Sequence, residues 1–172
     1  MKAILLLPIL ITSLMLYDFN SNSTKSDWQV VDDVVMGGRS DGRFSTNEAG
    51  HGIFQGKVSL ENNGGFSSLR HTLSATVGNN TKVSITLKGD GKVYQFRIKS
   101  SLNDRHSYIS EFQTTGDWQE VVIPLSSMYP AFRGRKLTIP NFNSDQISEI
   151  AFLIGNKKSE SFRMEISKIE LI

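Results

Sequence analysis

Three carboxylates, Asp32, Asp33 and Glu61, are the residues of this sequence best suited to acid–base chemistry. A glycosidase needs two carboxyl groups about 5–10 Å apart. Adjacent side chains on a strand point to opposite sides, so Asp32 and Asp33 would need Glu61 to complete such a pair. The simpler interpretation, which we favour, is that Asp32 caps a turn through hydrogen bonds with its own backbone. The sequence therefore predicts no catalytic carboxylates.

Other catalytic residue types are missing or unsuitably spaced. The chain has no cysteine, which excludes a disulfide, a thiol nucleophile and a thiolate zinc site. Its three histidines, His51, His71 and His106, lie too far apart in the sequence to form a local metal-binding motif. Ser67 and Ser68 lie near His71, but no nucleophile elbow surrounds them. We therefore expect a non-enzymatic protein without metal or cofactor.

The overall composition is that of a single folded domain. The chain has 172 residues, of which 38% are hydrophobic and 21% charged, which is enough apolar material for a packed core. Its 19 Lys and Arg residues against 17 Asp and Glu give a net charge of +2. Because this excess is so small, we expect no nucleic-acid partner.

The N-terminal apolar run, residues 4–16, is too short for a bilayer-spanning helix, which needs about 20 residues. It resembles a secretory signal, with Ser21–Ser23 as a cleavage site, or an uncleaved anchor. A third interpretation is an extension ahead of a true start at Met15. Cleavage near Ser23 would discard Leu16–Phe19, whose residues alternate like a strand.

We accordingly divide the chain into an apolar leader, residues 1–15, and a domain, residues 16–172. A start at Met15 would place the protein in the cytoplasm or at the inner face of the membrane. An export signal would instead place it in the periplasm or on a membrane anchor.

Period-two alternation dominates the domain and predicts strands with one buried face. The clearest examples are residues 83–87, 94–98, 150–154 and 162–166. Asp90-Gly91 is the clearest hairpin turn, since glycine supplies the positive φ that a tight turn requires. About ten such strands predict a jelly-roll β-sandwich of two antiparallel sheets. We expect residues 125–146 to form an irregular connection with at most a helical turn at Ser126–Tyr129.

Two glycine-rich segments, residues 28–40 and 54–70, stand out from this background. Neither is a phosphate loop, because Gly37-Gly38 lacks the following Lys-Ser/Thr and Gly64-Gly65 opens no helix. Paired glycines between strands usually serve tight turns or close backbone contacts. The residues that define these segments and a later tryptophan strand are Trp28, Asp33, Met36, Gly37, Gly38, Glu61, Gly64, Gly65, Phe66 and Trp118.

Together these segments resemble the signature of the complex I intermediate-associated protein thirty family. The likeness continues through Trp118–Leu125 and Phe132–Arg135 and covers about residues 16–170. Val34 is a departure, because the family tends to have glycine there. The resemblance implies a galactose-binding-like sandwich, a fold that carbohydrate-binding modules share. It also implies a chaperone-like assembly factor for respiratory or other membrane-complex subunits.

The candidate binding residues are polar and aromatic side chains near the paired glycines and on two strands. Asn62, Asn63 and Arg70 flank Gly64-Gly65, where backbone N–H groups would stand beside a guanidinium. The remaining candidates are Tyr94, Arg97, Tyr108 and Gln113, on successive strands, and Arg133, in a basic turn. If these residues line one concave sheet, they form a groove for a sugar, a peptide segment or another chain. Trp28 and Trp118 are expected to pack in the core or at an edge.

Two functions follow. The first is a non-enzymatic assembly factor that binds unfolded or partly assembled membrane-complex subunits. The alternative is a carbohydrate-binding module, since a fold shared with sugar binders is compatible with that function without establishing it.

Overall fold

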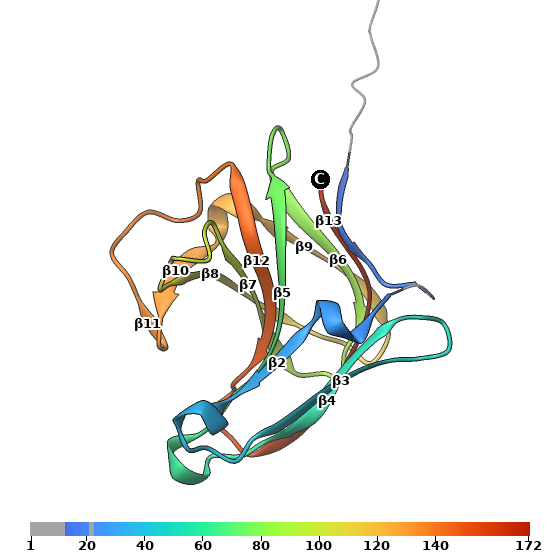
Figure 1. The fold of residues 1–172 in the computed structure, drawn as a ribbon, viewed down its shortest axis with the longest axis vertical. Coiled ribbons are helices and arrows are strands. Elements are labelled where there is room, and N and C mark those ends of the chain that lie inside the picture. Colours follow the sequence, from blue (N-terminus) through green and yellow to red (C-terminus); the bar gives the residue numbers. More distant parts are fainter. Residues whose placement is uncertain (1–12, 21–22) are drawn as a thin grey trace, which may run out of the picture.

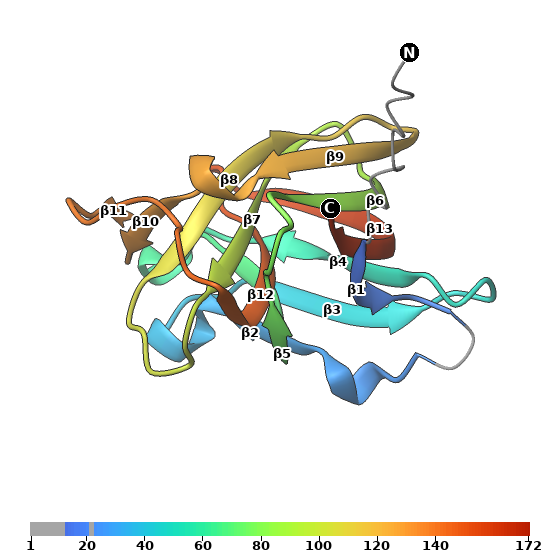
Figure 2. The same ribbon diagram turned by 90° about the horizontal axis from the view of Figure 1, so that it is seen from above.

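The computed structural model describes residues 13–20 and 23–172, which form thirteen β-strands in two antiparallel sheets and four short 3-10 turns (Figures 1 and 2). Residues 1–12 and Ser21–Asn22, and with them most of the leader and of the suggested cleavage site, lie outside the described residues. The described residues include no helix long and apolar enough to cross a membrane.

The first sheet has six strands. Its order is β3 (Asp41–Thr46), β4 (Gly52–Val58), β13 (Glu160–Leu171), β6 (Lys82–Lys88) and β9 (Trp118–Pro124). The sixth strand, β1 (Leu14–Asp18), pairs with the C-terminal half of β13, with Leu14 opposite Leu171. The alternating segment at Leu16–Phe19 therefore contributes a strand to the domain, as the sequence predicted.

The second sheet has seven strands. Its order is β11 (Arg135–Lys136), β10 (Tyr129–Phe132), β8 (Ser107–Gln113), β7 (Val93–Lys99), β12 (Gln146–Ile154), β5 (Ser67–Thr76) and β2 (Gln29–Asp32). Figure 1 shows this sheet curling from β10 and β8 on the left to β12 and β5 in the centre. We call its surface away from the core the curved face.

The core lies between the sheets and follows the alternation in the sequence. In β7, for example, Tyr94, Phe96 and Ile98 are buried while their neighbours are only half-buried. Trp28 is buried at the β2 edge, where its ring stacks on Phe19 at 5.4 Å between centroids. Burial of one face of every long strand is the main stabilising contribution to such a sandwich.

The predicted jelly-roll sandwich is confirmed, with more strands than the ten expected because short edge strands escaped the pattern. The segment 125–146 was predicted to be irregular, which is wrong in part. It contains β10 and β11, and Pro130 pairs opposite Tyr108 at the edge of the sheet, where proline is tolerated. A helical turn is present as η4 (Leu125–Ser127), one residue earlier than expected, and Tyr129 instead begins β10. The Asp90-Gly91 turn has the predicted positive φ, +81° at Gly91.

Three further 3-10 turns complete the chain: η1 (Lys25–Asp27), η2 (Asp33–Met36) and η3 (Glu61–Asn63). η2 and η3 lie in the two glycine-rich segments and meet at the lower end of the molecule in Figure 1.

Candidate functional site

The strand register places a continuous row of side chains across the curved face. From the β2 edge inwards, the row runs Gln29, Arg70, Ala151, Arg97, Ile109 and Tyr129. A flanking row brings Ser68, Leu153, Gln95 and Glu111 side by side. Ala151 and Ile109 are nearly inaccessible although they point away from the core, so they form an apolar floor beneath the longer polar side chains.

Arg97 lies in the middle of this row, and no ion pair of Arg97 is found among the described residues. It is half-buried, its Nε is fully buried, and that Nε has no hydrogen-bond partner. Burial and, next to it, the nearby positive charge of Arg70 together lower the pKa of Arg97 to about 10, against the opposing influence of Glu149 and Tyr129. The guanidinium remains cationic at neutral pH. A guanidinium whose buried Nε makes no hydrogen bond is costly for a folded protein and typical of a site that meets a ligand.

Arg70 lies on the other side of Ala151 and has a single weak contact, from its Nε to Ser68 Oγ at 3.4 Å. It borders a cleft of about 360 Å³ at the β2–β5 edge. Glu149 and Thr72 line the same cleft. The curved face therefore continues from the two arginines into a polar recess.

Tyr129 closes the opposite end of the row. Burial, and next to it the negative charge of Glu111, raise the pKa of the Tyr129 hydroxyl, whereas Arg97 lowers it. The ammonium group of Lys136 lies 5.2 Å from the centre of the Tyr129 ring, a cation–π distance. The face thus combines an aromatic ring, two guanidiniums, an amide and carboxylates.

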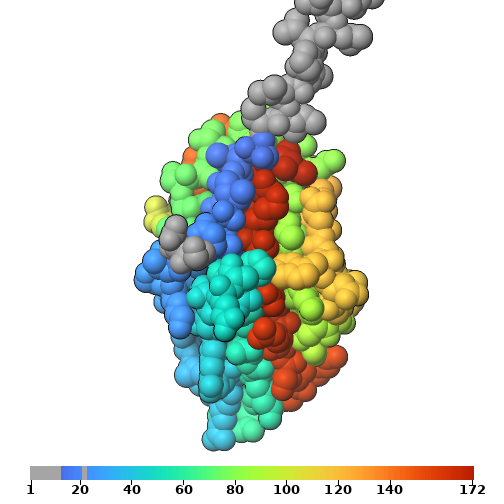
Figure 3. Space-filling model, turned by 90° about the vertical axis from the view of Figure 1, so that its right-hand side faces the viewer, coloured from blue at the N-terminus to red at the C-terminus, as the bar shows by residue number. Residues whose placement is uncertain are grey.

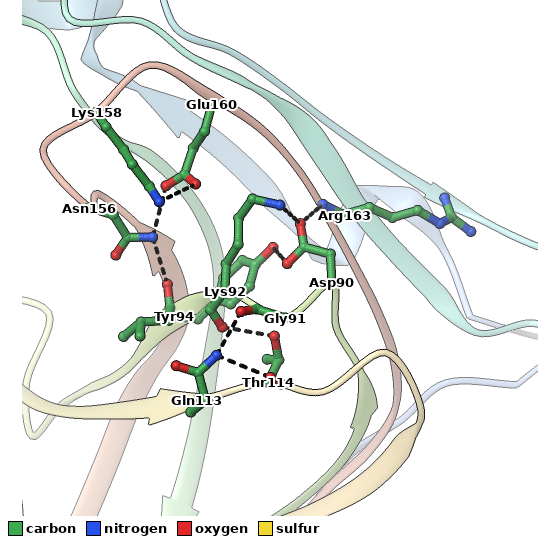
Figure 4. Close-up of polar contacts among 11 residues, drawn as sticks. Asp90, Gly91, Lys92, Tyr94, Gln113, Thr114, Asn156, Lys158, Glu160 and Arg163 are labelled. Atoms are coloured by element: carbon green, nitrogen blue, oxygen red, sulfur yellow. Dashed lines mark hydrogen bonds and ion pairs between the residues drawn. The ribbon is translucent and has the colours of Figure 1, made fainter.

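Two of the predicted binding residues face the wrong way, and their assignment is corrected here. Tyr94 is fully buried, because it alternates with Arg97 and therefore points into the core, where its hydroxyl donates to Asp90 Oδ1 at 3.1 Å (Figure 4). Tyr108 pairs with Ile98, on the core side, and packs against Phe142 with ring centroids 5.2 Å apart. Neither phenol reaches the curved face.

The other predicted residues are distributed around the molecule. Gln113 donates its amide to the carbonyl of Gly91 at 2.7 Å, so it fastens the β6–β7 hairpin (Figure 4). Arg133 is exposed in the β10–β11 turn, 5.4 Å from the Phe132 ring centre. Asn62 and Asn63 are exposed in η3 with positive φ. Of the predicted set, Arg70 and Arg97 come together on either side of Ala151. Gln113 lies on the same face farther along β8, opposite Val93, with its amide engaged by Gly91.

Sequence reasoning missed Tyr129, Glu149, Gln95 and Glu111. The alternation of 150–154 extended one step backwards would have placed Glu149 opposite the core residues. Tyr129 gave no such signal, because the neighbouring proline suggested a loop rather than a strand.

Asp33 joins the two glycine-rich segments. Its buried carboxylate accepts hydrogen bonds from the backbone N–H and hydroxyl of Ser40, at 3.0 and 2.5 Å. It also accepts from the backbone N–H groups of Gly65 and Phe66, at 2.5 and 3.2 Å. Burial alone would raise the pKa of Asp33, but these hydrogen bonds outweigh it and lower the pKa.

The glycines of both segments make room for that carboxylate. A Cβ added at Gly38 or at Gly64 would collide with the side chain of Asp33. The pairing of glycines with Asp33 is therefore an architectural requirement of the fold. Trp28 belongs to the same architecture through its buried ring, whereas Met36 and Glu61 are exposed.

Each of the three carboxylates considered for catalysis is already engaged. Asp32 accepts from Ser67 Oγ at 2.5 Å and from the N–H of Gly42 at 2.9 Å, so it bridges strands instead of capping a turn. Glu61 forms an exposed ion pair with Arg39 at 2.9 Å. Among the described residues, no group of three or more His, Asp or Glu side chains could hold a metal ion.

Trp118 lies on the outer surface of the six-stranded sheet. Its side chain is 43% exposed, and its ring meets that of His51 at 4.9 Å between centroids. Figure 3 shows the 47–51 turn, in teal, against the start of β9, in yellow-orange. This tryptophan is on the opposite sheet from the curved face and cannot act as a stacking platform there.

Several solved structures with a similar fold are carbohydrate-binding modules. A family 11 module from Clostridium thermocellum, solved with a beta-1,3-1,4-mixed-linked tetrasaccharide, is 20% identical to this chain, with a TM-score of 0.70. The matched region covers 93% of this chain and 95% of the module. The family 11 module of a cellulosomal cellulase from the same organism is 19% identical with a TM-score of 0.71, covering 94% of both chains. A family 29 module is 10% identical with a TM-score of 0.54, covering 93% and 87%. These likenesses establish the sandwich fold.

The sequence itself identifies a narrower group. The model of the complex I intermediate-associated protein 30 family matches residues 17–166, a range that includes both glycine-rich segments and nearly every strand. This chain belongs to the complex I intermediate-associated protein 30 family.

Proposed function

We propose that the protein is a non-catalytic assembly factor that binds a polypeptide segment of a partly assembled membrane-complex subunit on its curved face. The observation that carries the proposal is Arg97, a half-buried guanidinium with an unpartnered Nε in the middle of that face. An extended segment offers a backbone carbonyl or an acidic side chain to Arg97 and Arg70, and an apolar side chain to the floor at Ala151. Membership of the family supports a protein partner.

The engagement of the three carboxylates supports a non-catalytic role. Asp33 uses both of its oxygens to accept hydrogen bonds within the fold, and Asp32 does the same. A general acid or base must instead be free to exchange a proton with a substrate.

Site-directed cross-linking tests where a partner binds. The chain has no cysteine, so Thr72→Cys introduces a single attachment point beside Arg70 on the curved face. Val122→Cys on β9 is the matched control, because Val122 is 44% exposed on the other sheet. With a photoreactive cross-linker in native membranes, Thr72→Cys should recover a defined membrane-complex subunit and Val122→Cys should not. Equal recovery from both positions, or none from Thr72→Cys, would count against the proposal.

A carbohydrate ligand is the second candidate, favoured by a specific feature of the same face. Tyr129 supplies an aromatic surface across Ile109 from the planar side chain of Arg97, and Gln95 lies on the same face next to Glu111. Such combinations hold sugar rings and their hydroxyl groups. Calorimetry with mixed-linked glucan oligosaccharides and a glycan array separates the two candidates. Binding by the wild type that is lost in Arg97→Ala supports the sugar, and no binding across the array removes it.

A further inference from the structure

An apolar tip projects from the end of the sandwich where the two glycine-rich segments meet. Val34, Val35 and Met36, the last three residues of η2, are 58%, 75% and 59% exposed, and Leu60, directly before η3, is 43% exposed. Figure 1 shows η2, in light blue, beside the η3 turn, in green, at the lower end of the molecule. Four large apolar side chains gathered at one protrusion are unusual for a protein surface and mark a site of interaction.

The tip is held rigidly in this exposed state. The N–H groups of Gly37 and Gly38 donate to the carbonyls of Val34 and Asp33, at 2.9 and 3.0 Å, which closes the turn. The buried Asp33 carboxylate then binds Gly65, next to η3, so both segments share one anchor. Exposure of these side chains is therefore imposed by the fold.

Basic and acidic side chains both surround the tip, and the basic ones differ in whether a carboxylate pairs with them. Arg39, Arg43 and Lys158 each pair with a neighbouring carboxylate. Lys57 and Lys157 are exposed and have no ion-pair partner among the described residues. The 155–159 loop that carries Lys157 contacts the tip directly, because Ser159 Oγ accepts from the N–H of Leu60 at 3.3 Å. In Figure 3 the segments near residues 40, 60 and 157 meet at the lower end of the molecule.

We propose that this tip inserts Val34, Val35 and Met36 into the surface of an anionic membrane, with Lys57 and Lys157 at the headgroups. Four side chains are far fewer than the about 20–30 residues per partner that a stable protein interface uses. A lipid surface needs no complementary shape, and it rewards burial of apolar side chains next to lysines. The inference is independent of the proposed function, because the curved face is built from other residues.

A fluorophore on a single cysteine reports whether that position enters the bilayer, separately from any binding of the N-terminal apolar segment to the vesicle. The experiment therefore uses the full chain. Val35→Cys carries an environment-sensitive fluorophore, and Val122→Cys, exposed on β9, is the control. With vesicles of phosphatidylcholine and phosphatidylglycerol, the Val35→Cys label should shift to the blue and be quenched by bilayer-embedded quenchers. The Val122→Cys label should remain in water.

Charge reversal tests the headgroup contacts. Lys57→Glu with Lys157→Glu in the Val35→Cys background should weaken the response to anionic vesicles by about tenfold or more. Vesicles of phosphatidylcholine alone should give a weaker response than anionic vesicles.

Three results would overturn the inference. They are a Val35→Cys label that stays in water on vesicles, an unchanged affinity after charge reversal, and a blue shift that grows with protein concentration without lipid. The last would show that the tip binds a second copy of the chain. Loss of the curved-face cross-link with an intact vesicle response would instead affect only the proposed function.

Discussion

Arg70 and Arg97 flank Ala151 on the curved face, one strand to either side, so two guanidiniums approach each other over a small apolar floor. Their mutual repulsion and burial lower the pKa of Arg97 to about 10. Neither guanidinium forms an ion pair with a carboxylate of the described residues, and two such cations held close together raise the free energy of the unliganded protein. The arrangement makes sense if a ligand supplies the missing acceptor.

Arg97→Met should therefore stabilise the free protein. The thioether side chain keeps the apolar stem over Ile109 and removes a buried, unpartnered charge, so we expect a gain of about 1 kcal/mol in the free energy of unfolding. Urea denaturation at neutral pH measures it. Arg163→Met, on the outer surface of the other sheet, is the control and should change stability by less than about 0.5 kcal/mol. A clear loss of stability in Arg97→Met would show that Arg97 has a structural role.

Asp33→Asn should be strongly destabilising. The amide nitrogen cannot accept the hydrogen bonds that Asp33 receives from Ser40 and Gly65, so buried donors lose their partners. We expect a loss of about 3 kcal/mol in the free energy of unfolding. Glu61→Gln, at an exposed ion pair, should cost less than about 1 kcal/mol. Equal effects of the two substitutions would contradict the role assigned to Asp33.

The same residue predicts a pH dependence. The pKa of Asp33 is lower in the folded protein than in the unfolded chain, where it is about 3.9. Its stabilising contribution is therefore complete above that value and is lost as the pH falls through the folded-state pKa. Stability measured by urea at pH values from neutral down to about 3 should fall less steeply in Asp33→Asn than in the wild type. Parallel curves would contradict the lowered pKa.

The start of the folded domain can be tested by its length. A chain beginning at Thr24 lacks β1 and Phe19, whose ring stacks on Trp28, so Trp28 loses its cover. We expect the free energy of unfolding of this chain to be lower by about 3 kcal/mol or more than that of a chain beginning at Met15. Thermal unfolding of the two compares them directly. Phe19→Ala in the chain that begins at Met15 distinguishes the contribution of the Phe19 ring from that of strand β1. Equal melting temperatures of the Met15 and Thr24 chains would contradict the packing described.

The two tryptophans report on different surfaces. Trp28 is 6% exposed and Trp118 is 43% exposed, so the chain has one buried and one accessible indole. Acrylamide should quench the emission of Trp28→Phe, which retains Trp118, far more than that of Trp118→Phe. Trp28→Ala should lower the free energy of unfolding by about 4 kcal/mol, and Trp118→Ala should lower it by less than about 1 kcal/mol. Similar quenching of both variants would contradict the assignment of Trp28 to the core.

The fold could be predicted because alternation alone fixes which residues of a long strand are buried. In β7 the pattern correctly separated Phe96 from Arg97. The same pattern places Tyr94 with Phe96 in the core, so the assignment of Tyr94 as a binding residue was wrong on the alternation alone. Short edge strands such as β11 carry too few residues for a period to appear.

The candidate site was predictable only in part, because its residues meet through strand register. Nothing local shows that Tyr129 lies opposite Ile109, or that the amide of Gly65 reaches Asp33 from 32 residues away. Tyr108 faces the core because it pairs with Ile98, whereas the next residue, Ile109, pairs with Arg97 on the curved face. Which face of a strand meets the core depends on pairing that a single sequence does not display.

The cross-linking experiment identifies a partner, which can then be purified by itself. The most direct test of the central claim is the affinity of this free partner for the wild type and for Arg97→Ala, measured by titration calorimetry. The account predicts that Arg97→Ala weakens binding by about tenfold or more, that Arg97→Lys recovers part of the affinity, and that Arg163→Ala binds like the wild type. Equal affinities of the wild type and Arg97→Ala would contradict the assignment of the curved face as the binding site.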